Sequence, residues 1–167
     1  MSLQPSIFAD TESGPTIWIR VEGKGTFQNS PGLKEFSRQM MDTGRRDFVV
    51  DLANCPAMDS TFMGTLAGMA LRLREFGEGH LWVVNRNPRN NELLEGLGLD
   101  ALFAHDPAPD TLRTKSLNGS ALDASVDKEQ TREVMREAHE ACVEANPENA
   151  ARFKDVLEHL RASGKRG

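Results

Sequence analysis

One junction between a buried strand and a long helix most constrains how this chain folds. The apolar run 48–50 ends at Asp51 and leads into a short loop that contains Pro56. Helix-forming residues then run over 62–76, and Gly77 ends the segment. A short β-rich run followed directly by a helix predicts a sheet with helices packed against it.

The remaining signals in the first hundred residues repeat this alternation. Cap-plus-proline pairs at Ser30-Pro31 and Asn87-Pro88 predict the starts of two further helices. Alternating or continuous apolar residues predict strands at 6–9, 16–21, 48–52 and 80–84, with an edge strand at 101–103. The fold class is therefore α/β, with a mixed sheet of about four to five strands and helices packed against it.

The character of the sequence changes after His105. Prolines and polar residues over 106–126 indicate a loose linker. Asp127 and Gln130 resemble a capping box that starts a helix ending near Ala145. A last helix is expected from Asn146-Pro147 to about Ala162. We therefore expect a core domain over 1–105, the linker over 106–126 and a C-terminal helical pair over 127–167.

The two C-terminal helices carry narrow apolar stripes. Such helices are not stable alone and need a surface to cover them. That surface is either the core domain of the same chain, a partner protein, or a second copy that gives a homodimer. The stripes consist of Val134, Met135, Ala138, Ala141 and Cys142 on the first helix, and Phe153, Val156, Leu157 and Leu160 on the second.

Charge and composition exclude several function classes. The chain has 167 residues and a formal net charge of -5, so nothing draws it generally to nucleic acid or to an anionic membrane. No apolar run approaches the length of about 20 residues that a bilayer span needs, so no membrane insertion is expected. The N-terminus lacks the features of a secretory signal. The two cysteines form no framework, which fits a cytoplasmic protein.

The hydroxyl of Ser60 has a special position in this pattern. It stands where a helix begins, where the first N–H groups have no intrahelical acceptor and the helix dipole is positive. A phosphate on this hydroxyl would be held by both effects. The alternative interpretation is that Ser60 only caps the helix, a role worth about 1 kcal/mol.

Two blocks of sequence resemble the STAS family of anti-sigma factor antagonists. The first is the run D-L-A-N-C-P-A-M-D-S-T-F-M-G-T-L over 51–66, and the second is L-L-E-G-L-G-L-D-A-L-F over 93–103. The resemblance covers roughly residues 3 to 105. In that family the Ser after the Asp is the target of a kinase. One departure is Phe62, which stands where the family usually has Gly and is expected to alter the surface beside Ser60.

The resemblance implies a signalling module without enzymatic activity or cofactor. Its partners would be an anti-sigma factor that is also a Ser/Thr kinase, and a phosphatase that resets the cycle. Ser60 is the implied phosphoacceptor, with Thr61 as second choice. The implied partner-binding residues are Asn54, Met58, Asp59, Thr61, Phe62 and Met63. The alternative is a STAS adaptor or scaffold subunit of a larger assembly, such as a transport ATPase or a stress-sensing complex.

Other residue pairs are weaker candidates for chemistry. His139 and Cys142 lie three positions apart on an expected helix and could touch one metal ion, but core packing accounts for them better. Asp51 and Asp59 flank the loop before Ser60, where turn and cap hydrogen bonds are the usual role of acidic residues. We therefore predict no metal site and no catalytic site. A small-ligand sensor remains a third interpretation.

Overall fold

A single mixed sheet organises the protein. The computed structural model describes residues 6–12, 14–109, 120–122 and 127–164. Its strands lie in the order β4-β3-β2-β1-β5. β2, β3 and β4 are parallel, whereas β1 is antiparallel to both of its neighbours. The strands are β1 (Ser6–Asp10), β2 (Thr16–Glu22), β3 (Asp47–Asn54), β4 (His80–Val84) and β5 (Ser120–Ala121). The predicted α/β class with a mixed sheet is confirmed.

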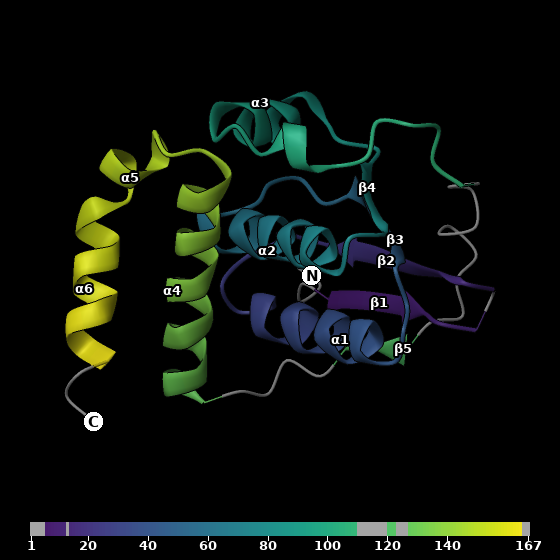
Figure 1. The fold of residues 1–167 in the computed structure, drawn as a ribbon, viewed down its shortest axis with the longest axis horizontal. Coiled ribbons are helices and arrows are strands. Elements are labelled where there is room, and N and C mark those ends of the chain that lie inside the picture. The colour runs from purple at the N-terminus through teal and green to yellow at the C-terminus, as the bar shows by residue number, and fades with distance from the viewer. Residues whose placement is uncertain (1–5, 13, 110–119, 123–126, 165–167) are drawn as a thin grey trace.

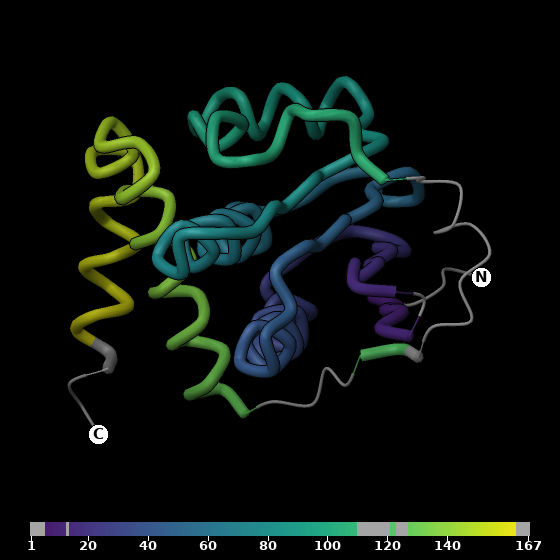
Figure 2. The backbone as a smooth tube through the Cα atoms, turned by 45° about the vertical axis from the view of Figure 1, so that its right-hand side comes forward, coloured from purple at the N-terminus to yellow at the C-terminus, as the bar shows by residue number. Residues whose placement is uncertain are grey.

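Helices lie in successive layers beside this sheet. Figure 1 shows α1 and α2 running next to the strands, with α4 and α6 farther out. The 45° turn of Figure 2 gives the same order, so α4 lies between α2 and α6. The helices are α1 (Ser30–Asp42), α2 (Ser60–Phe76), α3 (Pro88–Gly96), α4 (Lys128–Ala145), α5 (Asn149–Arg152) and α6 (Lys154–Gly164).

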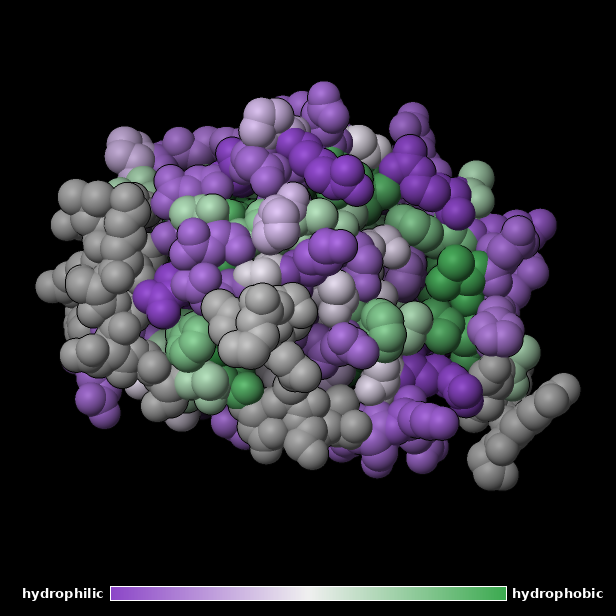
Figure 3. Space-filling model, turned by 180° about the vertical axis from the view of Figure 1, so that it is seen from behind, coloured by the Kyte–Doolittle hydropathy of each residue, from purple (hydrophilic) through white to green (hydrophobic). Residues whose placement is uncertain are grey.

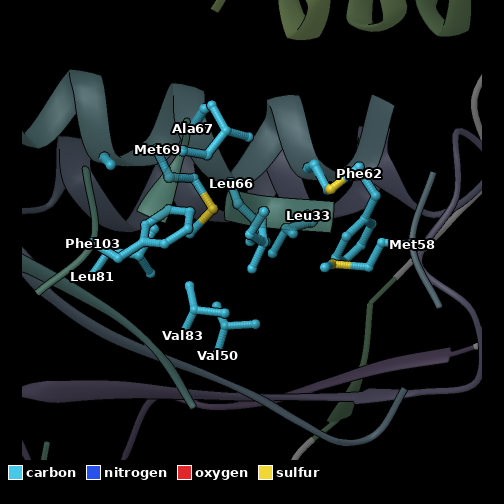
Figure 4. Close-up of a cluster of buried hydrophobic side chains, with 14 of the residues drawn as sticks. Leu33, Val50, Met58, Phe62, Leu66, Ala67, Met69, Leu81, Val83 and Phe103 are labelled. Atoms are coloured by element: carbon cyan, nitrogen blue, oxygen red, sulfur yellow. The ribbon is translucent and has the colours of Figure 1, made fainter. Parts of the chain in front are cut away.

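The main core fills the space between the sheet and its helices. Leu33 of α1 and Leu66 of α2 meet Val50 and Val83 of the central strands. Phe62, at the start of α2, points into the same layer (Figure 4). All five side chains are at most 5 % exposed. Their burial fixes the start of α2 firmly against the sheet.

A second, smaller cluster lies on the other face of the sheet. It contains Trp18, Val49 and Trp82. The Trp82 indole donates to the Asp106 carbonyl across 3.1 Å, so the chain after β4 passes over this face. β3 is thus buried on both faces, as its continuous apolar sequence predicts. Seen from behind, hydrophobic atoms appear only as separate areas among hydrophilic ones (Figure 3).

Three segments differ in detail from the predicted elements. The predicted edge strand at 101–103 is wrong, because Asp100–Leu102 forms a 3₁₀ helix and only the Ala104 N–H reaches β4, donating to Leu81. Three apolar residues are too few for periodicity to identify a strand. The last predicted helix is broken at Phe153 into α5 and α6. Within the predicted linker, Ser120–Ala121 pairs with β1, whereas 110–119 and 123–126 lie outside the described residues.

The C-terminal helices dock on the same chain. α4 packs along α2, and α6 packs along α4. Cys142, Phe153 and Leu157 belong to the main hydrophobic core. The apolar stripe of α4 is therefore covered in cis. In the part of the chain that the structure describes, no helix combines the length and apolar character needed to cross a bilayer.

Candidate functional site

The site lies where β3 passes into α2. β3 ends at Asn54, and four residues later Met58 pairs with Gly25 of the loop after β2. The Gly25 N–H donates to Ala57 across 3.0 Å, and the Asp59 N–H donates to Gly25 across 2.9 Å. Two loops distant in sequence thus form one surface around the first turn of α2.

Asp59 caps α2 and ties the two loops together. One carboxylate oxygen accepts from the Phe62 N–H at 2.8 Å, and the other accepts from the Phe27 N–H at 2.8 Å. The alternative that Ser60 is the cap is therefore wrong. Asp caps as well as Ser does, and here the residue before Ser60 has the extended backbone that a cap requires. The Ser60 hydroxyl is left available for another role.

That hydroxyl meets a side chain from the far end of the sequence. Ser60 Oγ lies 2.8 Å from His139 Nε2, although the two residues are 79 positions apart. His139 Nδ1 lies 2.6 Å from the Met135 carbonyl oxygen. A carbonyl oxygen only accepts, so Nδ1 carries a proton, and in the neutral ring Nε2 is the acceptor for the Ser60 hydroxyl.

His139 is held rigidly in this position. It is 3 % exposed, and its ring packs on Phe153 in a T-shaped arrangement with centroids 4.8 Å apart. Ser60, by contrast, is partly exposed. The pair therefore consists of a buried imidazole and the hydroxyl of a partly exposed residue.

Gly64 of α2 determines how closely α4 approaches this pair. A Cβ at Gly64 would lie 2.2 Å from the Ala138 carbonyl oxygen, whereas one at Gly68 would meet only the Ala141 Cβ at 4.0 Å. Because Gly64 has no side chain, the backbone of α4 can lie directly against α2 at this position, which any larger residue would prevent. The contact places Ala138, and hence His139 next to it, over the first turns of α2.

The structure divides the predicted partner-binding residues by exposure. Asn54 is exposed, and Asp59 is partly exposed beside Ser60. The buried members are Met58, Thr61, Phe62 and Met63. Partner binding by all of these residues stays a prediction, but only the first group reaches the surface in this conformation.

Phe62 occupies the core and not the surface beside Ser60. It is fully buried, and a Cβ at Gly25 would lie 2.6 Å from its ring. Figure 4 shows its ring next to Met58, on the sheet side of α2. The expectation that it alters the surface next to Ser60 is therefore corrected. The Phe62 ring fills the space that Gly25 leaves open in the loop after β2.

His139 is the residue of this site that the sequence analysis assigned to core packing. The missed signal is a polar side chain on the buried stripe of α4, since buried polar groups need a hydrogen-bond partner. Both of its ring nitrogens are engaged. Among the described residues, no group of three or more His, Cys, Asp or Glu side chains is placed to hold a metal ion.

Burial disfavours the thiolate form of both cysteines. Cys142 of α4 is fully buried, and desolvation raises the pKa of its thiol to about 12. Desolvation also raises the pKa of the Cys55 thiol, against hydrogen bonds from the backbone that lower it. Because the thiolate is the reactive form, burial lowers the reactivity of both thiols.

Known proteins share this fold. A protein from Thermotoga maritima, described as a candidate anti-sigma factor antagonist, is 15% identical over 57% of this chain and 82% of its own, with a TM-score of 0.53. The phosphorylated form of SpoIIAA, a Bacillus cell fate determinant, is 16% identical over 66% of this chain and 97% of its own, with a TM-score of 0.51. These low identities show the fold alone.

The family assignment rests on the sequence itself. No curated protein matches the chain significantly. The family model described as "Mlab, STAS domain" matches residues 8–104. This match covers β2 to β4, α1 to α3, and the Asp59-Ser60 junction. The chain belongs to the STAS domain family.

Proposed function

We propose that this chain is a non-catalytic cytoplasmic signalling module that binds an anti-sigma factor with Ser/Thr kinase activity. Phosphorylation of Ser60 ends the binding, and a phosphatase restores it. The observation that carries this proposal is the partly exposed residue Ser60 at the first position of α2, directly after the capping Asp59. The likeness to a fold solved in a phosphorylated form supports it.

The switch is a local change of charge. Phosphorylation adds about -1.5 to -2 charges beside the Asp59 carboxylate. The helix dipole stabilises a phosphate at this end of α2, so the fold persists. At an interface, however, an unmatched buried charge costs several kcal/mol, enough to dissociate a complex of micromolar affinity. Binding is lost while the protein stays folded.

The first test is modification by a kinase. The protein is incubated with ATP and Ser/Thr kinases of its native host, and the phosphorylated residue is mapped by mass spectrometry. We expect phosphate on Ser60, because Thr61, the second choice, is buried in this conformation. Phosphate found only elsewhere in the chain, or no phosphate with any of these kinases, would remove the mechanism.

The second test compares two variants in binding. Ser60→Ala keeps the surface neutral and should bind the captured kinase as wild type does. Ser60→Asp adds a negative charge and should bind at least about tenfold more weakly, which corresponds to about 1.4 kcal/mol. Protein phosphorylated at Ser60 serves as the reference, because a carboxylate reproduces only part of a phosphate's charge. Equal affinities of all three forms would contradict the charge switch.

A second candidate is an adaptor subunit of a larger assembly, such as a transport ATPase or a stress-sensing complex. It is favoured by the hydrogen bond between Ser60 and His139, which gives the hydroxyl a structural partner without any modification. Affinity capture from the native host discriminates the two. A kinase released by Ser60→Asp supports the first function, whereas an ATPase retained by both variants supports the second.

A further inference from the structure

Ser60 has the surroundings of an activated nucleophile. Three groups are linked by two hydrogen bonds: the hydroxyl oxygen lies 2.8 Å from one nitrogen of the His139 ring, and the Met135 carbonyl lies 2.6 Å from the other. A nucleophile, a base within hydrogen-bond reach and a third group that orients the base form the arrangement by which serine hydroxyls are activated. We propose that His139 is the base that activates Ser60 for attack on a phosphoryl donor.

The geometry favours this role over simple packing. The Met135 carbonyl holds the proton on Nδ1, which leaves the Nε2 lone pair directed at the Ser60 hydroxyl. Burial of the ring at 3 % exposure keeps water from competing for that lone pair. Ser60 itself is a partly exposed residue, so the proposed nucleophile lies nearer the surface than its buried base.

The reaction needs no basic group from the kinase, because His139 accepts the hydroxyl proton. The Ser60 Oγ–P bond forms, and the bond from phosphorus to its leaving group breaks. The hydroxyl proton moves to His139 Nε2. The leaving group is a nucleoside diphosphate when a kinase supplies a nucleoside triphosphate, and fluoride when the donor is an alkyl fluorophosphonate. The imidazolium formed lies next to the new phosphoester and stabilises its charge.

The inference rests on the proposed function only for the identity of the natural donor, so a small donor tests it directly. The 167-residue chain is treated with an alkyl fluorophosphonate, and labelling of Ser60 is followed by mass spectrometry. We expect Ser60 to react faster in the native protein than in urea. We also expect His139→Ala and His139→Gln to react about a hundredfold more slowly, within the usual range of general-base catalysis.

Two controls separate chemistry from folding. His159→Ala, on an exposed position of α6, should label as wild type does. Added imidazole should restore part of the reactivity of His139→Ala, which a purely structural role would not allow. Continued resistance of the buried Cys142 thiol to alkylation shows that α4 is still docked in each variant.

The outcomes distinguish this inference from the proposed function. Native Ser60 that reacts no faster than in urea overturns the inference, whatever the variants do. A docked His139→Gln protein that labels at the wild-type rate also overturns it. Labelling that depends on His139, in a protein that no host kinase phosphorylates, supports the inference and removes the proposed function. Phosphorylation of the wild-type protein by a host kinase, without fluorophosphonate labelling of Ser60, supports the proposed function and overturns the inference.

Discussion

At the scale of single residues, adjacent side chains at the start of α2 have separate roles. Asp59 satisfies two backbone N–H groups, on Phe62 and Phe27. Ser60 satisfies none of them and contacts His139 instead. A short Asp-Ser sequence therefore combines a helix cap with an available hydroxyl. This separation permits modification of Ser60 without loss of the cap.

Stability measurements can verify this division of roles. Asp59→Ala should lower the free energy of unfolding by about 1–2 kcal/mol, because the cap is lost. Ser60→Ala should cost about 1 kcal/mol in wild type, because the buried Nε2 of His139 loses its donor. In a His139→Ala background the same change should cost close to nothing. Urea titrations measure wild type, Asp59→Ala and the three proteins of the Ser60–His139 cycle, and equal costs of Ser60→Ala in both backgrounds would contradict the pairing of Ser60 with His139.

The Cys142 thiol gives a prediction on pH. Its folded pKa of about 12 lies above the ordinary value of 9.0, so folding favours the protonated form. Its contribution to stability is complete below pH 9 and is lost as the pH rises from 9 toward 12, by at most about 1.4 kcal/mol per pH unit. Urea unfolding at pH 8, 9 and 10 should show a steeper decline for wild type than for Cys142→Ala. Parallel curves would contradict the assignment.

At the scale of elements, the crossing of α2 and α4 decides where His139 lies. α2 carries two glycines four positions apart, Gly64 and Gly68. In the structure these glycines face α4, and only Gly64 is in close contact, with the Ala138 backbone. The apolar side chains of α2, such as Phe62 and Leu66, face the sheet. α2 therefore packs on the sheet through apolar side chains and on α4 through a surface of glycines.

The two glycines make a matched pair for mutation. Gly64→Ala should destabilise the protein and increase alkylation of Cys142, because its Cβ would overlap the Ala138 carbonyl and displace α4. Gly68→Ala should stabilise the protein by roughly 0.5–1 kcal/mol, since Ala is the better helix former and its Cβ meets only ordinary contact. Thermal melts and iodoacetamide labelling measure both effects. The same sign for both variants would contradict the described crossing.

At the scale of the whole molecule, the C-terminal helices share the core of the sheet domain. Cys142, Phe153 and Leu157 lie in one cluster with Ile19 and Val50 of the strands. The division into 1–105, 106–126 and 127–167 stays a prediction about sequence organisation. The packing argues that the first and last of these segments unfold together, because neither buries its apolar surface alone.

This cooperativity can be measured with two probes. Trp18 and Trp82 lie on the far face of the sheet, so tryptophan fluorescence reports on the sheet. Far-UV circular dichroism at 222 nm reports mainly on the helices. We expect both signals to give one coincident transition in urea. An earlier transition in circular dichroism would show that the C-terminal helices form a separate unit, free to bind a second copy or a partner.

The sequence by itself determined the elements that depend on local chemistry. β2 forms where apolar residues alternate, α4 starts with the Asp127–Gln130 capping box, and α2 ends at Gly77. The weak segments were short apolar runs such as 101–103, where a strand and a turn of helix look alike. The position of Ser60 at the start of α2 also followed from local signals, because a cap, a loop proline and a helical run lie close together in the chain.

Only the tertiary structure decided which groups meet at Ser60. The contact with His139 spans 79 positions and depends on α4 crossing α2 at Gly64. Likewise, Phe62 lies inside because Gly25, on a different loop, leaves room for its ring. Helix periodicity says that a face is apolar, but not which surface covers it. Packing of distant segments makes that choice, and so it also sets the chemistry of the Ser60 hydroxyl.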